Sequence, residues 1–237
     1  MNTEFGKRNA NPKCWASVLG ECKGPLNKEH LFSESLYSEN LIHVDGAPWL
    51  SGPKMEIGRS SLTSNILCKG HNNKLSPVDN EAVHLRDAIK LMKDPMKRPD
   101  SKILQPPPEI RISGTKFGQW LCKTHCNYVT VTGGIPKLCY VQYAFGERTK
   151  EKIFFYFVIE GTQLRVGREH YTYIAPPVNY NVYDFIIIFS GIKVLVTTVQ
   201  IISYEEILID RLYDFQHRTQ LGFYKIHFDW SDEPMPL

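Results

Sequence analysis

The sequence contains no hydrophobic run long enough to cross a membrane, and this absence narrows the classes of protein to which it can belong. A bilayer-spanning helix needs about 20 consecutive apolar residues, whereas apolar runs such as Phe185 to Phe189 are far shorter. Residues 1–12 are polar and lack the apolar segment of a secretory signal. We therefore expect a cytoplasmic protein with no membrane partner.

The chain also has little net charge, at +3 over 237 residues. Affinity for phosphates comes from Lys and Arg, so this balance permits a nucleic-acid partner without arguing for one. A solvated surface is the simpler interpretation of the one basic stretch, which holds Lys90, Lys93, Lys97, Arg98 and Lys102. Cytosolic thiols stay reduced, so we expect the six cysteines to be metal ligands or buried residues rather than disulfides.

Composition divides the chain into three regions. Residues 1–93 are rich in Cys, His, Asn and Gly, and they hold most of the candidate metal ligands. Residues 94–109 are proline-rich, which predicts an extended and exposed linker because proline removes backbone donors and blocks helix. Residues 110–237 are rich in β-branched and aromatic residues, and we expect them to form a β-rich companion domain.

The first region is predicted to end in a helix that starts near Ser76. Serine suits the N-cap, Pro77 the first turn, and Asp79 the positive end of the helix dipole. Asp79 has a second interpretation, in which it reaches a metal ion. Apolar residues then recur at helical spacing, at Val78, Ala82, Leu85, Ile89 and Met92.

The companion domain is predicted to open with a helix over Thr115 to Tyr128 and to continue as a mostly antiparallel sheet. Tyr204 to His217 is predicted to be a further helix. The consecutive aromatics of Phe154 to Phe157 must point to alternate sides of a strand, and a sheet covered on both faces explains them without a ligand. The predicted strands are Ile153 to Ile159, Tyr171 to Ile174, Tyr183 to Phe189, Ile192 to Val199 and Phe223 to Trp230.

Two pairs of soft ligands lie in the first region, Cys14 with Cys22 and Cys68 with His71. Structural zinc takes four Cys or His ligands, commonly as two close pairs separated by a longer loop. The pattern therefore predicts a zinc site, and the alternative is buried, unligated cysteines with a surface histidine. A weaker group contains Cys122, Cys126 and Cys139, of which the first two have the spacing of helix positions.

Between these pairs stands Glu29-His30, and the second pair is framed by Asn65 and Asn72 in Asn65-Ile-Leu-Cys68-Lys-Gly-His71-Asn72. This ordered set, over residues 14 to about 92, resembles the HNH endonucleases, which have a ββα-metal fold. The resemblance implies an α+β protein: an N-terminal HNH domain with structural zinc, followed by the β-rich α+β companion domain.

The resemblance also implies a role for each matching residue. His30 would be the general base that takes a proton from the attacking water, and Asn72 would hold a catalytic Mg²⁺ or Mn²⁺ ion together with His30. Asn65 would occupy the middle position of the motif, for which Thr63 and Ser64 are alternatives. Glu29 would be a metal ligand, a partner of one, or an exposed charge. Departures from the pattern are a Cys₃His zinc set and an apparent inserted loop over Tyr37 to Ser60.

The function implied is hydrolysis of phosphodiester bonds in DNA, with the companion domain supplying specificity or regulation. Similar HNH proteins serve in restriction or phage defence, which implies a partner ATPase or another defence subunit. Double-strand cutting by one site per strand would require a homo-oligomer. The alternative is a zinc-stabilised module that binds nucleic acid without cutting it, or an interaction subunit.

Overall fold

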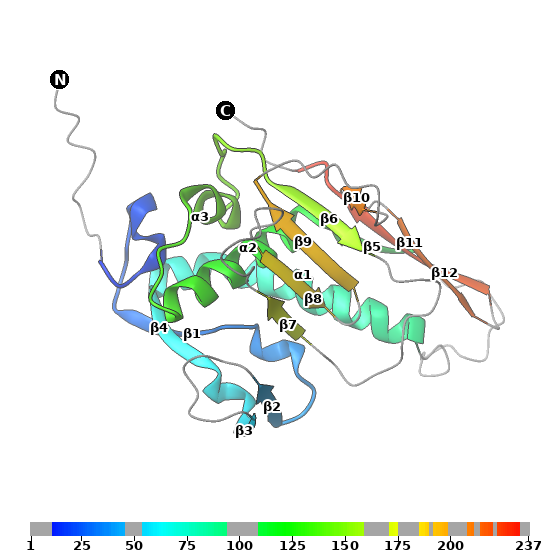
Figure 1. Ribbon diagram of the computed structural model, residues 1–237, viewed down its shortest axis with the longest axis horizontal. Helices are drawn as coiled ribbons and strands as arrows, with labels where there is room; N and C mark the ends of the chain where they lie inside the picture. The colour runs from blue at the N-terminus through cyan, green and yellow to red at the C-terminus, as the bar shows by residue number, and fades with distance from the viewer. Residues whose placement is uncertain are drawn as a thin grey trace. The chain divides into compact units, whose positions relative to one another are not determined.

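The computed structural model describes residues 11–45, 54–93, 109–158, 171–174, 185–189, 192–198, 208–210, 214–219 and 222–232. The chain is mixed α+β (Figure 1). It forms two compact units that interleave in sequence, Met1–Asn80 with Gln119–Thr149 and Glu81–Gly118 with Lys150–Leu237. The proline-rich linker at 94–109 predicts a single boundary, and its residues 94–108 lie outside the described residues. None of the described helices has the length and hydropathy needed to cross a membrane.

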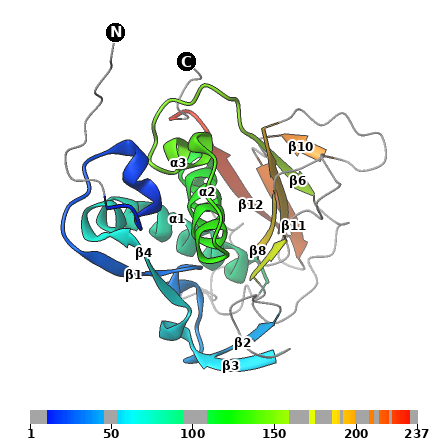
Figure 2. The same cartoon turned by 60° about the vertical axis from the view of Figure 1, so that its left-hand side comes forward.

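The first unit is built on an antiparallel strand pair followed at once by a helix. Strand β1 (Leu26–His30) pairs with β4 (Thr63–Cys68), and α1 (Lys69–Lys93) starts at the residue after β4 (Figure 2). The segment predicted as an inserted loop holds an antiparallel hairpin of β2 (Leu41–Asp45) and β3 (Lys54–Gly58). The short 3-10 helices are η1 (Trp15–Leu19), η2 (Glu34–Leu36) and η3 (Arg59–Ser61).

Helix α1 begins seven residues earlier than the sequence predicts, at Lys69 rather than near Ser76, so that prediction is wrong. Pro77 lies inside the helix, where it removes one backbone hydrogen bond. Burial on both sides of the proline offsets this cost, since Leu75 and Val78 are 0% and 5% exposed. The predicted apolar spacing is confirmed at the positions whose side chains are described, which are Val78, Ala82, Leu85 and Ile89.

Helix α2 (Gly114–Val131) confirms the helix predicted over Thr115 to Tyr128. Phe117, Trp120, Leu121 and Thr124, which recur at helical spacing along it, are buried. The short helix α3 (Leu138–Ala144) follows it in the chain and carries the buried Cys139. Cys122 and Cys126 lie in α2, as their spacing predicts, and all three cysteines of this group are buried.

The second unit contains a five-stranded antiparallel sheet in the order β10-β6-β9-β8-β7. Phe154 to Phe157 are all buried, with Phe157 packed against Phe117 and Phe228 on one side and Phe154 stacked on Tyr156 on the other. Covered faces thus explain the consecutive aromatics. The strands are β6 (Phe154–Val158), β7 (Tyr171–Ile174), β8 (Phe185–Phe189), β9 (Ile192–Thr197) and β10 (Leu208–Asp210).

A second sheet in this unit joins sequence-distant strands. Strand β12 (Gly222–Asp229) pairs antiparallel with β11 (Asp214–Thr219) and parallel with β5 (Ile110–Ser113). The helix predicted over Tyr204 to His217 is wrong where it is described, because 208–210 and 214–217 are strands. Pairing with β6 and β12 supplies these segments with backbone partners and overrides their weak local helical pattern.

Gly114 is required where β5 turns into α2. A Cβ atom at this position would lie 2.5 Å from Cδ2 and 2.8 Å from Nε1 of the buried Trp230 indole. We expect Gly114→Ala to destabilise the protein by about 1–3 kcal/mol because overpacking outweighs the helix propensity of alanine. Denaturant unfolding measures this cost, and the same substitution in a Trp230→Leu background should cost less. An equal cost in both backgrounds would exclude the clash with the indole as its cause.

Candidate functional site

Three thiols and one imidazole form a buried cluster in the first unit. The ligand atoms of Cys14, Cys22, Cys68 and His71 all lie within 4.8 Å of one another. His71 Nδ1 is 3.4, 3.8 and 3.3 Å from the Sγ atoms of Cys14, Cys22 and Cys68, respectively. Tetrahedral zinc, with bonds of about 2.3 Å to sulfur and about 2.0 Å to nitrogen, keeps such ligands about 3.5 Å apart. The predicted ligand set is thus assembled and can hold a structural metal such as zinc.

The unusually wide spacing of the first cysteine pair is explained by local structure. Cys14 directly precedes η1, and the chain then reverses through two residues with positive φ, Gly20 at 77° and Glu21 at 55°. A positive φ is uncommon outside glycine, so Glu21 marks a tight turn. This turn delivers Cys22 to the same point as Cys14.

The second pair is delivered by the junction of β4 and α1. Cys68 ends β4 and His71 lies in the first turn of α1, where Gly70 N donates to Lys23 O at 2.9 Å. A Cβ on Gly70 would approach Lys23 Cβ to 2.9 Å, so this contact requires glycine. The backbone amides of Cys68 and His71 donate to the sulfurs of Cys14 and Cys68, at 3.3 and 3.4 Å. Such bonds stabilise negative charge on the sulfurs.

The electrostatics of the cluster suit a cation. Burial, and then the Lys74 charge, lowers the pKa of His71, which favours the neutral imidazole that binds metals. Burial raises the pKa of Cys14 to about 12, with the neighbouring Cys22 and Cys68 adding to it. Burial alone would raise the pKa of Cys68 also, but backbone hydrogen bonds from His71 and Lys23 lower it. A metal ion at this donor set takes the place of thiol protons, and its binding releases them.

Replacing Cys68 by serine is expected to abolish stoichiometric zinc binding, because a hydroxyl is a poor substitute for a thiolate ligand. Metal content of the purified protein, measured by plasma mass spectrometry, checks this. Cys122→Ala is the matched control, since Cys122 is equally buried but lies in α2 outside the cluster. Full zinc occupancy in Cys68→Ser would remove Cys68 from the ligand set.

The β1–β4 pair places four of the polar residues of the motif region on one face. Thr63 lies opposite His30 and Asn65 opposite Lys28, and alternation along each strand puts all four on the same side. His30 is half-buried and Asn65 exposed, so this face meets solvent. Thr63, rather than Asn65, is the cross-strand partner of His30.

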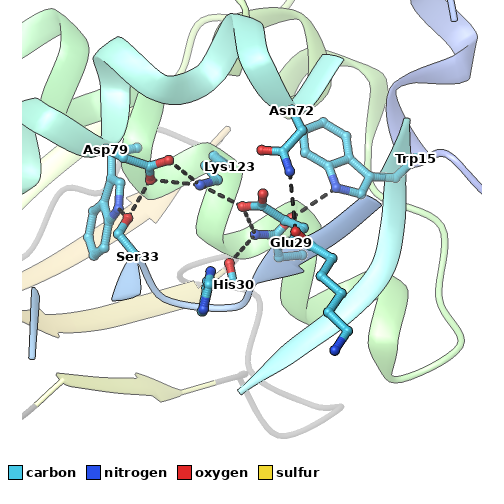
Figure 3. Close-up of polar contacts among 10 residues, drawn as sticks. Trp15, Glu29, His30, Ser33, Asn72, Asp79 and Lys123 are labelled. Carbon is cyan, nitrogen blue, oxygen red and sulfur yellow. Dashed lines mark hydrogen bonds and ion pairs between the residues drawn. The ribbon is translucent and has the colours of Figure 1, made fainter. Parts of the chain in front are cut away.

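Asn72 is held beside this strand pair. Its Nδ2 donates to the backbone oxygen of Lys28 at 3.3 Å, which joins the first turn of α1 to β1 two residues before His30 (Figure 3). The side chain is half-buried, so its amide retains access to solvent. Asn72 and His30 are thus carried by elements that contact each other.

Glu29 faces the opposite side of β1 and enters a buried ionic network. Lys123, 2% exposed, lies 2.6 Å from Glu29 Oε1 and donates to both oxygens of Asp79 at 2.6 and 2.8 Å (Figure 3). Ser33 donates to Asp79 and accepts a bond from Trp120 Nε1 at 2.9 Å. Glu29 and Asp79 therefore pair with the ammonium group of Lys123. Asp79 neither caps α1 nor joins the metal cluster.

Asn127 ties this network to the metal cluster. Its Nδ2 donates to Glu29 Oε1 at 3.2 Å and to the backbone oxygen of His30 at 3.1 Å. Its Oδ1 accepts a bond from Trp15 Nε1 at 2.9 Å, and Trp15 directly follows the ligand Cys14. The fully buried amide of Asn127 thus holds both the segment after Cys14 and the end of β1 at His30.

Charge balance sets the protonation of the network. Burial would lower the pKa of Lys123, but the charges of Glu29 and Asp79 outweigh it and raise the pKa. Burial raises the pKa of Glu29, and the Asp79 charge adds to this effect. Because the raised Lys123 pKa keeps the ammonium charged at neutral pH, its contribution to stability is lost only as the pH rises through that value in the folded protein.

Removing the Lys123 charge is expected to be costly. Lys123→Met leaves the buried Glu29 carboxylate and the partly buried Asp79 carboxylate without a cation, which should destabilise the protein by about 3–5 kcal/mol. Thermal or denaturant unfolding measures the change. Lys116→Met, at an exposed position of the same helix, is the control and should stay within about 0.5 kcal/mol of wild type. Equal stability of the two variants would show that the network is dispensable.

Lys123 and Asn127 were missed by the sequence analysis, although a signal was present. Together with Trp120 they recur at helical spacing along the buried face of α2, where a charged residue needs a partner. Arg59, which also contacts the site, lies in the segment that was predicted to be an inserted loop, and Glu34 lies just before that segment.

Comparison with known proteins supplies no relative: no family model matches the chain, and no curated protein or solved structure matches it.

Proposed function

We propose that this protein is a metal-dependent endonuclease of the HNH type, which hydrolyses phosphodiester bonds in DNA with His30 as the general base. The observation that supports this best is the placement of His30 and Asn72. The Cys₃His cluster joins β4 and α1 to the segment before β1, and Asn72 is bonded to β1 two residues from His30. A strand pair followed at once by a helix supports the ββα-metal interpretation.

The proposed chemistry follows from the solvent-facing side of β1 and β4. His30 accepts a proton from the attacking water, and Asn72 would hold a divalent cation through its amide oxygen. That cation, Mg²⁺ or Mn²⁺, would stabilise the charge that develops on the phosphate. Asn65 lies on the same face and is available to orient the substrate or the loop. Glu29 takes no part, because its carboxylate is engaged by Lys123.

A second candidate function is a zinc-stabilised module that binds nucleic acid without cutting it. The observation in its favour is that His30 belongs to no group of three or more possible ligand side chains among the described residues. In the described part of the chain, the Cys₃His cluster is the one group of three or more Cys, His, Asp or Glu side chains close enough to hold an ion. A catalytic cation would therefore depend on amide, water and phosphate oxygens. A role in phage defence, with a partner ATPase, stays a prediction under either function.

Nicking of supercoiled plasmid DNA in Mg²⁺ or Mn²⁺ tests the nuclease proposal. We expect His30→Ala to lower the rate by about 10²–10⁴-fold, the usual contribution of a general base. His43→Ala is the matched control, since His43 lies exposed in β2, where it pairs with Glu56. Both variants must retain the zinc content of wild type.

The outcomes separate the two functions. Metal-dependent nicking that His30→Ala removes and His43→Ala retains would establish the nuclease. Zinc-loaded wild-type protein that retains DNA in a mobility-shift assay but leaves it uncut, with or without added cell extract, would favour the binding module.

A further inference from the structure

Glu34 connects His30 to the guanidinium of Arg59, a residue that the motif does not include. Its Oε2 lies 3.4 Å from His30 Nε2, and its Oε1 lies 3.5 Å from Arg59 Nε. The side chains of His30, Glu34 and Arg59 are 25%, 38% and 36% exposed, so the cluster lies at the surface, in contrast to the buried Lys123 network.

The elements around the β2–β3 hairpin hold this cluster in place. Glu34 comes from η2, before the hairpin, and Arg59 from η3, directly after it. Arg59 N donates to Asn40 O at 2.9 Å, and its Nη1 donates to Tyr37 O at 3.1 Å. The guanidinium is therefore fixed from the backbone side, and Glu34 is placed between it and the imidazole.

The contact with Glu34 selects one form of the His30 ring. Nε2 is shielded from solvent and lacks a hydrogen-bond partner among the described residues, while the Glu34 carboxylate lies beside it. A bare lone pair facing a carboxylate is repelled, whereas an N–H is attracted. Of the two neutral tautomers, the one with its proton on Nε2 is therefore favoured. Nδ1 then carries the lone pair that can accept a proton from water.

Arg59 suits a phosphate ligand. Its described contacts use Nε and Nη1, and the planar guanidinium has further donors that match phosphate oxygens in pairs. Exposed ion pairs contribute only about 0–1 kcal/mol to stability, so folding alone gives little reason for a carboxylate that bridges an arginine and the candidate base.

We propose that Glu34 is a positioning residue that holds His30 with its proton on Nε2 and aligns Arg59 beside it, and that Arg59 binds the phosphate of the phosphodiester substrate. This inference rests on the proposed nuclease function and adds to it a substrate contact from outside the motif.

Nitrogen-15 NMR of the full-length protein, labelled at histidine, reads the ring directly. His30 signals are assigned by their loss in His30→Ala. At alkaline pH the wild-type ring should be mainly protonated on Nε2, and Glu34→Ala should shift it toward a mixture. Glu56→Ala, which removes the carboxylate beside His43, is the control and should leave His30 unchanged. An unchanged His30 tautomer in Glu34→Ala would overturn the positioning role.

Phosphate binding is tested with a fluorescein-labelled DNA duplex in buffer without divalent ions. Arg59→Ala should weaken binding about tenfold or more, and Arg59→Lys should restore it only in part because lysine lacks the paired donors. The control is Lys150→Ala, an exposed cation of the second unit. DNA binding by Arg59→Ala that equals wild type would overturn the phosphate contact.

Cleavage kinetics then link both roles to the reaction. Glu34→Ala should lower kcat by about 10–100-fold, as for other partners that orient a functional histidine, and should raise KM less than Arg59→Ala does; Glu34→Asp should recover part of the loss in kcat. Zinc content and melting temperature should match wild type in each variant. If wild-type protein does not cut DNA, the proposed function fails while the tautomer and binding results still decide this inference.

Discussion

The Cys₃His cluster is the constraint on which the first unit depends, because it brings together ligands from the two ends of the η1 segment, from β4 and from α1. Cys14 and Cys22 bracket a short 3-10 turn, Cys68 ends a strand, and His71 lies in the helix that follows. A bound ion would fix the exit of β4, the start of α1 and the approach to β1 at one point. The bond from Asn72 to Lys28 O and the early start of α1 at Lys69 both follow from that junction.

The Lys123 network is a second constraint, and it explains why the candidate site tolerates a strand with little hydrophobic character. Strand β1 presents only Glu29 to the core, and an unpaired carboxylate there would cost several kcal/mol. Lys123 compensates for this charge, and Asp79 and Ser33 satisfy the remaining donors and acceptors. Because Asn127 also holds the backbone oxygen of His30, the same network that stabilises the core sets the position of the candidate base.

Local patterns in the sequence predict the parts of the fold that local physics decides. Helix α2, four of the five strands of the large sheet and the four members of the Cys₃His cluster could be recognised from spacing and composition. The start of α1 could not, because a Ser-Pro-x-Asp segment has the same local preferences inside a helix that packing stabilises as at a helix end. The strands at 208–210 and 214–219 also depend on remote partners. Glu29 was left open among three roles, and only the tertiary position of Lys123, 94 positions along the chain, separates them.

Alternation along β1 assigns opposite tasks to two adjacent residues. Glu29 points to the core and is neutralised by a fixed ammonium, whereas His30 points to the solvent-facing side and meets the Glu34 carboxylate. A one-residue shift of the β1–β4 register would exchange these environments, placing an imidazole against Lys123 and removing the carboxylate that the lysine requires. Two contacts therefore fix the register. One is the Cys₃His cluster next to the Leu26↔Cys68 pair, and the other is the Glu29–Lys123 ion pair near the opposite end of β1. Two constraints on a strand of five residues are consistent with a requirement to hold His30 in one place.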